Sequence, residues 1–260
     1  LPGRCQVKVV AYGGGTNSTA MLVLMHENGI RPDMILFADT GGEKPHTYDH
    51  LKVVNAWCEK VGFPGIVITR KRGRIYVGET LEQNCLRKNM LPSIAYGYKS
   101  CSLKYKVQPQ DMYCNNNAEC KAAWASGEKL QKYIGYDADE ERRAKIKSDD
   151  KYEYIYPLIQ AGWGREECVE AIARNGLPQP GKSACFFCPS SKKQEILDLR
   201  KQYPELMERA LAMEEQAELT SVKGLGRSFS WREFLQATDA QQSLVSDAGK
   251  EMDCGCYDGD

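Results

Sequence analysis

Two stretches of this sequence carry residues whose types and spacing suit chemistry, and the first is a loop rich in glycine. An apolar run at 9–12 ends at three glycines, followed by small hydroxyl and amide residues and then by apolar residues with helical spacing. This order is typical of a strand, a tight loop and a helix, where glycines let a phosphate approach the backbone and the helix N-terminus attracts negative charge. A plain turn would share the pattern, so the loop predicts an anion site that its surroundings must support. The loop residues are Gly13, Gly14, Gly15, Thr16, Asn17 and Ser18.

The second stretch contains Cys185 and Cys188, which are separated by two phenylalanines. Two thiolates on one turn suit a single metal centre. A redox pair has the same spacing, and so would two buried structural thiols. The 11 cysteines are spread over 260 residues, and in a reducing compartment clustered cysteines indicate metal binding or catalysis more often than disulfides. The spacing predicts a metal centre, with a redox pair as the alternative.

Charge is balanced over the chain, with 35 basic and 35 acidic residues. Global charge therefore predicts neither nucleic-acid binding nor membrane binding. The range 70–74 is a local exception, with four cations in five residues. These cations could bind phosphate, sulfate or a nucleic-acid backbone, or they could simply belong to a solvated loop. No apolar run approaches the roughly 18 residues of a membrane-spanning helix, and the first residues lack the apolar core of a signal peptide. We expect a cytoplasmic protein without a membrane partner.

The elements that would position these stretches alternate between strand and helix patterns. Apolar runs predict strands at 9–12, 34–38, 65–69, 133–137 and 152–156, and helical spacing occurs at 46–60 and 118–130. This alternation predicts an α/β fold with a doubly wound, mostly parallel five-stranded sheet and helices on both faces. Ligands of such sheets bind beyond the carboxyl ends of the strands. Asp39 and Thr40, which follow the second strand, should therefore face the same crevice as the glycine loop, although a local turn would also explain Asp39.

The patterns also predict two regions. Residues 1–160 form the sheet domain, with an irregular insertion at about 70–132 whose part 75–98 could close over the site. Residues 161–260 form a C-terminal helical annex, in which 194–218 is helical with a break at Pro204. The annex contains Cys185 and Cys188 and ends with the tail Cys254-Gly255-Cys256.

The glycine loop resembles the pyrophosphate loop, Ser-Gly-Gly-x-Asp-Ser, of the adenine-nucleotide α-hydrolase (PP-loop ATP pyrophosphatase) superfamily. Gly13 stands where that loop has its first serine, and Asn17 stands where it has its aspartate. Within the superfamily, the chain is similar to the phosphoadenosine phosphosulfate (PAPS) reductase-like family of iron–sulfur type. The motifs that carry this resemblance occur in the family's order and are Asp39-Thr40-Gly41, Cys101 with Lys106-Val107-Gln108-Pro109, 135–143, Tyr156-Pro157-Leu158, Trp163, Leu177-Pro178, 184–189 and Asp253-Cys254-Gly255-Cys256.

The resemblance implies which residues bind which groups. An adenine nucleotide would bind the loop together with Asp39, Thr40, Gly135 and Arg142, with Mg²⁺ on its phosphates. A [4Fe-4S] cluster would be held by cysteines, but this chain has Ser100 beside Cys101 where the reductases have a cysteine pair. Either Cys254 or Cys256 supplies a fourth ligand, or three cysteines hold a cluster with one open iron. The ligands that we expect are Cys101, Cys185, Cys188 and Cys256, with Cys254 as the reactive thiol.

Three functions agree with this resemblance. The first is an enzyme that uses ATP to adenylate an acceptor, releases pyrophosphate and delivers sulfur from a sulfur donor to that acceptor, for which family precedent suggests a nucleic acid. The second is a reductase of adenylyl sulfate (APS) or PAPS, in which Cys254 attacks the substrate sulfur and a thioredoxin-like reductant completes the reaction that produces sulfite. The third is a non-catalytic nucleotide-binding component of a modification complex, which Asn17 in place of aspartate would favour.

Overall fold

The computed structural model describes residues 6–72, 77–144, 146 and 148–248. By their contacts the residues divide into two units. The first comprises Leu1–Gln83 and Lys99–Cys185, and the second comprises Asn84–Tyr98 and Phe186–Asp260. Residues 161–185 thus belong with the sheet, and residues 84–98 belong with the C-terminal helices. Within the described parts of the chain, no helix is both long and apolar enough to cross a membrane.

The first unit is built on a parallel five-stranded sheet with the order β3-β2-β1-β4-β5. Every residue of β2 is buried, as expected for a central strand covered on both faces. The fold class predicted from the sequence is therefore confirmed. The strands are β1 Lys8–Tyr12, β2 Met34–Asp39, β3 Ile66–Arg70, β4 Leu130–Ile134 and β5 Tyr152–Ile155.

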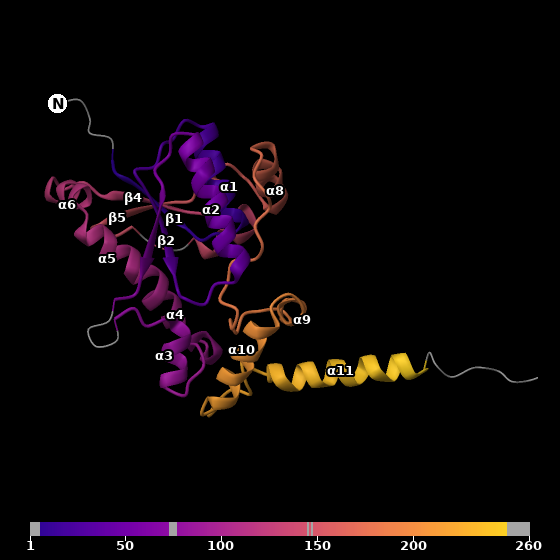
Figure 1. The fold of residues 1–260 in the computed structure, drawn as a ribbon. Helices are drawn as coiled ribbons and strands as arrows, with labels where there is room; N and C mark the ends of the chain where they lie inside the picture. Colours follow the sequence, from indigo (N-terminus) through magenta and orange to yellow (C-terminus); the bar gives the residue numbers. More distant parts are fainter. Residues whose placement is uncertain (1–5, 73–76, 145, 147, 249–260) are drawn as a thin grey trace, which may run out of the picture. The chain divides into compact units, whose positions relative to one another are not determined.

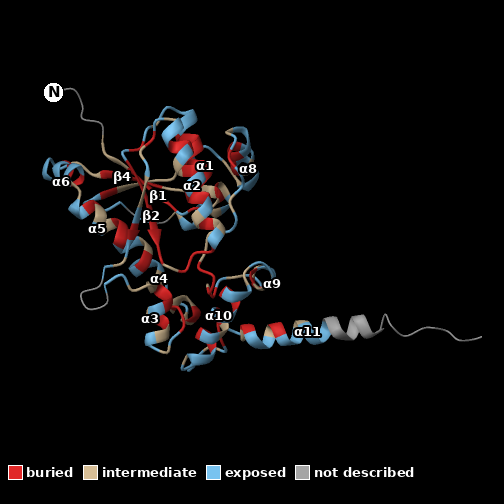
Figure 2. Ribbon diagram, viewed as in Figure 1, coloured by how far each residue is buried: buried red, intermediate tan, exposed pale blue. Residues whose placement is uncertain are grey.

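Helices cover both faces of this sheet (Figure 1). On one face α1 (Thr16–Glu27) and α2 (Pro45–Lys60) share a hydrophobic core with alternate strand residues such as Val10 and Phe37, and α8 (Arg165–Arg174) packs against α1. Burial of one such large side chain contributes about 1.5–3 kcal/mol. Figure 2 shows the buried residues along the strands and on the helices beside them.

The opposite face is covered by α5 (Gln108–Asn116) and α6 (Ala118–Ala125). Their buried residues pack on Val9 and Leu36, which alternate along the strands with the residues of the other face. The unit also contains shorter helical segments, which are α4 Ser100–Ser102, the π-helical turn Leu103–Val107, the 3-10 turn Ala138–Arg143 and α7 Pro157–Gln160.

One strand and one helix differ from the sequence prediction by several residues. Helix α6 ends at Ala125 rather than near residue 130, because Gly127 has φ +78, a conformation that ends helices. Strand β4 consequently begins at Leu130 rather than at residue 133. Its Lys132 is only 4% exposed and pairs with Asp111 at 2.9 Å, so a polar residue in the sequence occupies a buried strand position.

The second unit is helical, and a buried carboxylate organises its C-terminal part. Its elements are the end of α3 (Leu81–Arg87), the 3-10 turn Ser93–Tyr96, α9 Lys193–Gln202, α10 Pro204–Gln216 and α11 Trp231–Ala248. The predicted break at Pro204 is confirmed, because α10 begins there. Glu214, which is 6% exposed, accepts hydrogen bonds from the backbone N–H of Leu225 (2.7 Å), Trp231 (2.9 Å) and Arg232 (3.1 Å), and from the Ser230 hydroxyl (2.6 Å). This carboxylate fixes the start of α11 to α10.

Candidate functional site

The glycine loop joins the end of β1 to the start of α1. Gly14 has φ +71, in the left-handed region, and Gly15 is the N-cap residue in an extended conformation. The Ser18 hydroxyl accepts a hydrogen bond from the Gly15 N–H at 3.2 Å and donates one to the Gly15 carbonyl at 3.0 Å. The loop therefore leads from the carboxyl end of a central strand into the N-terminus of α1, as predicted.

Two of the three glycines are required by their surroundings. A Cβ atom at Gly14 would lie 3.1 Å from Thr47 Cγ2 and 3.3 Å from Phe37 Cε2, and one at Gly15 would lie 2.7 Å from Ser183 Oγ. At Gly13 the nearest atom would be 3.7 Å away, which is an ordinary contact. Backbone conformation and close approach thus require glycine at position 14, a side chain at position 15 would displace the Ser183 hydroxyl, and position 13 has room for a Cβ atom.

Gly135, just after β4, lies against the beginning of α1. A Cβ atom there would be 3.0 Å from the backbone atoms of Asn17 and Ser18. Strands β1 and β4 are neighbours in the sheet, and the chain order of the strands reverses between them. Ligands of open α/β sheets bind at such a switch point. The structure thus brings Gly135 and the glycine loop together where such a ligand would bind.

The side chain of Asn17 is held between acidic groups. Its Nδ2 donates to Asp137 Oδ2 at 2.8 Å and to Glu140 Oε2 at 3.1 Å, and its Oδ1 accepts from Arg165 Nη1 at 3.3 Å. Burial, and then the charge of Glu140, raise the pKa of Asp137. A neutral amide at position 17 donates to both carboxylates, whereas a carboxylate there would repel them.

We accordingly expect Asn17→Asp to destabilise the protein by about 1–3 kcal/mol, because two donated hydrogen bonds are replaced by repulsion. The loss should be largest near neutral pH and should shrink as the carboxyl groups protonate at lower pH. Urea unfolding at several pH values measures it. Adding Asp137→Asn should recover part of the loss, and an unchanged loss in that double variant would contradict the explanation.

Asp39 is bound entirely by groups of the protein itself. Its Oδ1 accepts from the Gly41 N–H and the Tyr48 hydroxyl, both at 2.8 Å, and its Oδ2 accepts from Arg70 Nε at 2.9 Å and Nη2 at 2.8 Å. Burial, and then Asp39 itself, raise the pKa of Tyr48. Asp39 also lines a pocket of about 310 Å³ with Thr40, but no residue of the glycine loop lines that pocket. Asp39 therefore positions Arg70, and its contact with a nucleotide stays a prediction.

Residues 181–185, which we call the strap, run beside the glycine loop. The Lys182 carbonyl lies 3.3 Å from His46 Nε2, and Cys185 forms an antiparallel bridge with Glu43. Between these two attachments, Ser183 lies against Gly15. The sequence did not predict that Ser183 lies against the glycine loop, because nothing in the local pattern indicates which distant segment covers the loop.

Two buried polar atoms near the strap lack a partner among the described residues. Glu43 is 5% exposed; its Oε1 accepts from the Thr40 hydroxyl at 3.3 Å and lies 3.4 Å from Lys106 Nζ, but its Oε2 has no hydrogen bond. The hydroxyl of Thr47, which is 1% exposed, also has none. Each such group costs about 1–3 kcal/mol. Buried groups of this kind are expected where a ligand or water completes the site.

A buried hydrogen-bonded chain supports α1 behind the loop. The Tyr12 hydroxyl lies 3.0 Å from Thr19 Oγ1, which lies 3.2 Å from His50 Nε2. Burial lowers the pKa of His50, and burial likewise lowers that of the half-buried His46. Both imidazoles are therefore neutral in the folded protein at a pH where they would be charged in the unfolded chain.

This difference predicts that stability falls as the pH is lowered. Below about 6.5, the ordinary pKa of histidine, the unfolded chain takes up protons that the folded protein does not, so unfolding is favoured. We expect the melting temperature to decrease from pH 7 to 5.5. In His50→Gln the melting temperature should depend less steeply on pH, and His46 should account for the dependence that is left. An equal slope in that variant would show that His50 is not responsible.

The predicted metal ligands are divided between the two units. Cys185 is buried in the first unit, 3.1 Å from the Thr40 hydroxyl, and Cys101 is half-buried in that unit, whereas Cys188 belongs to the second unit. Among the residues that the structure describes, no group of three or more His, Cys, Asp or Glu side chains could hold a metal ion. Cys254 and Cys256 lie outside the described residues. The ligand set therefore stays a prediction.

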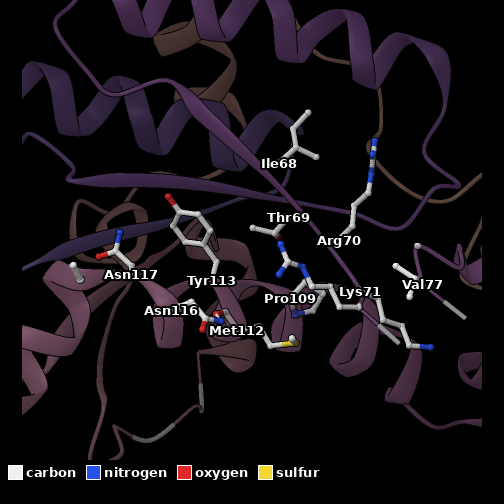
Figure 3. Close-up of a pocket in the computed structure, with 13 residues that line it drawn as sticks. Ile68, Thr69, Arg70, Lys71, Val77, Pro109, Met112, Tyr113, Asn116 and Asn117 are labelled. Carbon is white, nitrogen blue, oxygen red and sulfur yellow. Dashed lines mark hydrogen bonds between the residues drawn. The ribbon is translucent and has the colours of Figure 1, made fainter. Parts of the chain in front are cut away.

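The predicted basic stretch is partly neutralised by its neighbours. Arg70 pairs with Asp39, and Lys71 donates to the Tyr105 hydroxyl at 3.0 Å and lies 3.9 Å from Glu79. Arg72 is exposed, and Arg74 lies outside the described residues. Arg70, Lys71, Arg72 and residues of α5 line a pocket of about 710 Å³ (Figure 3). Two of the four cations are therefore already engaged, which lowers the charge available to a nucleic acid.

Arg142, the last predicted nucleotide contact, is exposed in the turn Ala138–Arg143. Its neighbour Arg143 pairs with Glu140 and lies over the ring of Tyr136 at 4.4 Å. Arg143 is therefore engaged by Glu140 of its own turn and by Tyr136, which precedes that turn. The role of Arg142 stays a prediction.

Comparison with known proteins gives a distant similarity to solved structures. No protein-family model matches the sequence, and no curated protein matches it. The structure is similar to the U34-tRNA thiolase NcsA from Methanococcus maripaludis with its [4Fe-4S] cluster, with a TM-score of 0.43 and 17% sequence identity over 86% of this chain and 77% of that chain.

Proposed function

We propose that this protein binds ATP at the loop Gly13–Ser18, adenylates an oxygen of an acceptor with release of pyrophosphate, and then transfers sulfur from a sulfur donor to that acceptor, so that the adenylated oxygen leaves as part of AMP. The observation that carries the proposal is the position of the loop. A tight glycine turn leads into a helix N-terminus without a side-chain cap, lies against Gly135 at the switch point of a parallel sheet, and has beside it the buried Thr47 hydroxyl, which lacks a partner among the described residues. These features together suit a phosphate chain better than a plain turn.

The chain's own residues would act mainly by position and charge. Backbone N–H groups at the start of α1 would hold the β and γ phosphates, with Mg²⁺ bound to them, because the first turn of a helix leaves such donors without intrahelical partners. The acceptor oxygen would attack the α phosphorus, lose its proton and displace pyrophosphate. Stabilising the charge of the leaving pyrophosphate is the contribution expected of this loop.

For the sulfur step, we propose Cys101, Cys185, Cys188 and Cys256 as ligands of a [4Fe-4S] cluster. Protein purified and reconstituted without oxygen should be brown, and Cys185→Ala should lose the iron. Cys168→Ala, which removes a thiol buried under α8, should keep it. Colourless, iron-free protein after reconstitution would exclude the cluster.

The tail distinguishes sulfur transfer from sulfonucleotide reduction. Incubation with ATP should release pyrophosphate, whereas incubation with APS or PAPS and thioredoxin should yield no sulfite. Sulfite formation that Cys254→Ser eliminates, with nucleotide affinity unchanged, would instead establish the reductase, since a hydroxyl is a far poorer nucleophile than a thiolate. Nucleotide binding without either product would establish the non-catalytic component. A nucleic acid is the proposed acceptor, and its addition should increase the release of pyrophosphate.

A further inference from the structure

The glycine loop contributes few hydroxyl groups of its own to a bound phosphate. Its first three residues have no side chain, and the Ser18 hydroxyl is engaged with both backbone groups of Gly15. The strap brings a further hydroxyl to the same place. Ser183 Oγ would lie 2.7 Å from a Cβ atom at Gly15, and the structure gives this hydroxyl no hydrogen-bond partner among the described residues.

We propose that Ser183 is a phosphate-binding residue, whose hydroxyl donates a hydrogen bond to the phosphate chain of the nucleotide held on the glycine loop. The inference rests on the proposed nucleotide site. It extends that site to a residue on a distant segment that the loop sequence does not contain.

The strap is attached on both sides of Ser183, so this hydroxyl is fixed relative to the loop. On one side the Lys182 carbonyl lies 3.3 Å from His46 Nε2, and a Cβ atom at Gly181 would lie 2.6 Å from the His46 ring. On the other side Cys185 is bridged to Glu43. Ser183 itself is only partly buried, and a ligand on the loop can therefore reach its hydroxyl.

Thr47 provides an independent indication that a polar ligand belongs here. It lies in the first turn of α2, is 1% exposed, and has a methyl group 3.1 Å from the Cβ position of Gly14. Its hydroxyl has no partner among the described residues. A phosphate chain on the loop would give both hydroxyl groups a hydrogen-bond partner, because Thr47 and Ser183 both lie beside Gly14.

Binding experiments with three probes test the assignment on the full chain. The probes are α,β-methylene-ATP with Mg²⁺, inorganic pyrophosphate, and adenosine, each titrated by calorimetry. Ser183→Ala should weaken the first two by about 10- to 100-fold, as expected for a lost hydrogen bond to a charged group, and should leave adenosine binding unchanged. The affinity of Ser183→Thr should be within a few-fold of that of the natural protein. Ser190→Ala, which changes an exposed serine two residues after Cys188, should bind all three probes normally.

Thr47→Val separates a ligand role from a packing role. The variant removes a buried hydroxyl that has no protein partner, so its melting temperature should not fall. Its affinity for pyrophosphate should decrease. Unchanged affinity of Ser183→Ala, in a protein that binds α,β-methylene-ATP, would overturn the assignment and leave the nucleotide site standing. Tighter binding by Ser183→Ala would also overturn it, by showing that the strap obstructs the loop. Absence of binding by the natural protein would overturn the nucleotide site itself.

Discussion

Gly14→Val is expected to abolish nucleotide binding in a protein that still folds. Valine is strained at φ +71, and its Cβ would press against Thr47 and Phe37, at 3.1 and 3.3 Å. The loop would have to move away from the position in which its backbone can approach a phosphate. Calorimetric titration with α,β-methylene-ATP measures the loss, and circular dichroism verifies that the sheet is intact.

The two neighbouring glycines provide matched controls. Gly15→Ala should also impair binding, because its Cβ would lie 2.7 Å from Ser183 Oγ, whereas Gly13→Ala meets its nearest atom at 3.7 Å and should bind normally. This order, with positions 14 and 15 sensitive and position 13 tolerant, follows from the surroundings of the loop and not from its sequence. Normal affinity in a folded Gly14→Val protein would mean that the loop is only a turn.

The largest loss of stability is expected for Glu214→Ala in the second unit. The variant removes the acceptor of four hydrogen bonds and leaves the buried N–H groups of Leu225 and Trp231 without the carboxylate to which they donate. Hydrogen bonds to charged groups contribute about 1.5–3 kcal/mol each, and their losses are not additive. We expect the free energy of unfolding to fall by at least about 3 kcal/mol, measured by urea unfolding.

The adjacent Glu215 is the control for this prediction. It is exposed and pairs with Arg232 at 2.8 Å on the surface. Exposed ion pairs of this kind contribute less than about 1 kcal/mol, so Glu215→Ala should be nearly neutral. Similar losses for the two variants would show that the buried carboxylate does not organise the start of α11.

Much of the sheet was predictable because its strands are encoded locally. Short apolar runs placed β1, β2, β3 and β5 within a residue or so, and the glycine loop indicated the turn into α1. Strand β4 was misplaced because Lys132 is polar in sequence and becomes buried only through its pair with Asp111, a contact made between elements. The grouping of residues 84–98 with the C-terminal helices was not predicted for a similar reason. No local pattern indicates which distant part of the chain a short helix packs against.

The candidate site was predictable only in part, for the same physical reason. The loop and Gly135 could be identified from the sequence, and the structure brings them together. The full engagement of Asp39 by Arg70 and Tyr48, and the position of the strap, depend on contacts between segments far apart in the chain. Asn17 looked like a loss of function in the loop, but its neighbours Asp137 and Glu140 give a structural reason for an amide.

Labelled ATP shows whether the protein cleaves ATP between its α and β phosphates. The protein is incubated with Mg²⁺, a sulfur donor, a bulk RNA preparation and ATP labelled at either the α or the γ phosphate, with Gly14→Val as the blank. We expect the α label to appear in AMP and the γ label in pyrophosphate, and we expect the blank to form neither product. Formation of ADP and inorganic phosphate, or binding of ATP without any cleavage, would contradict the proposed function.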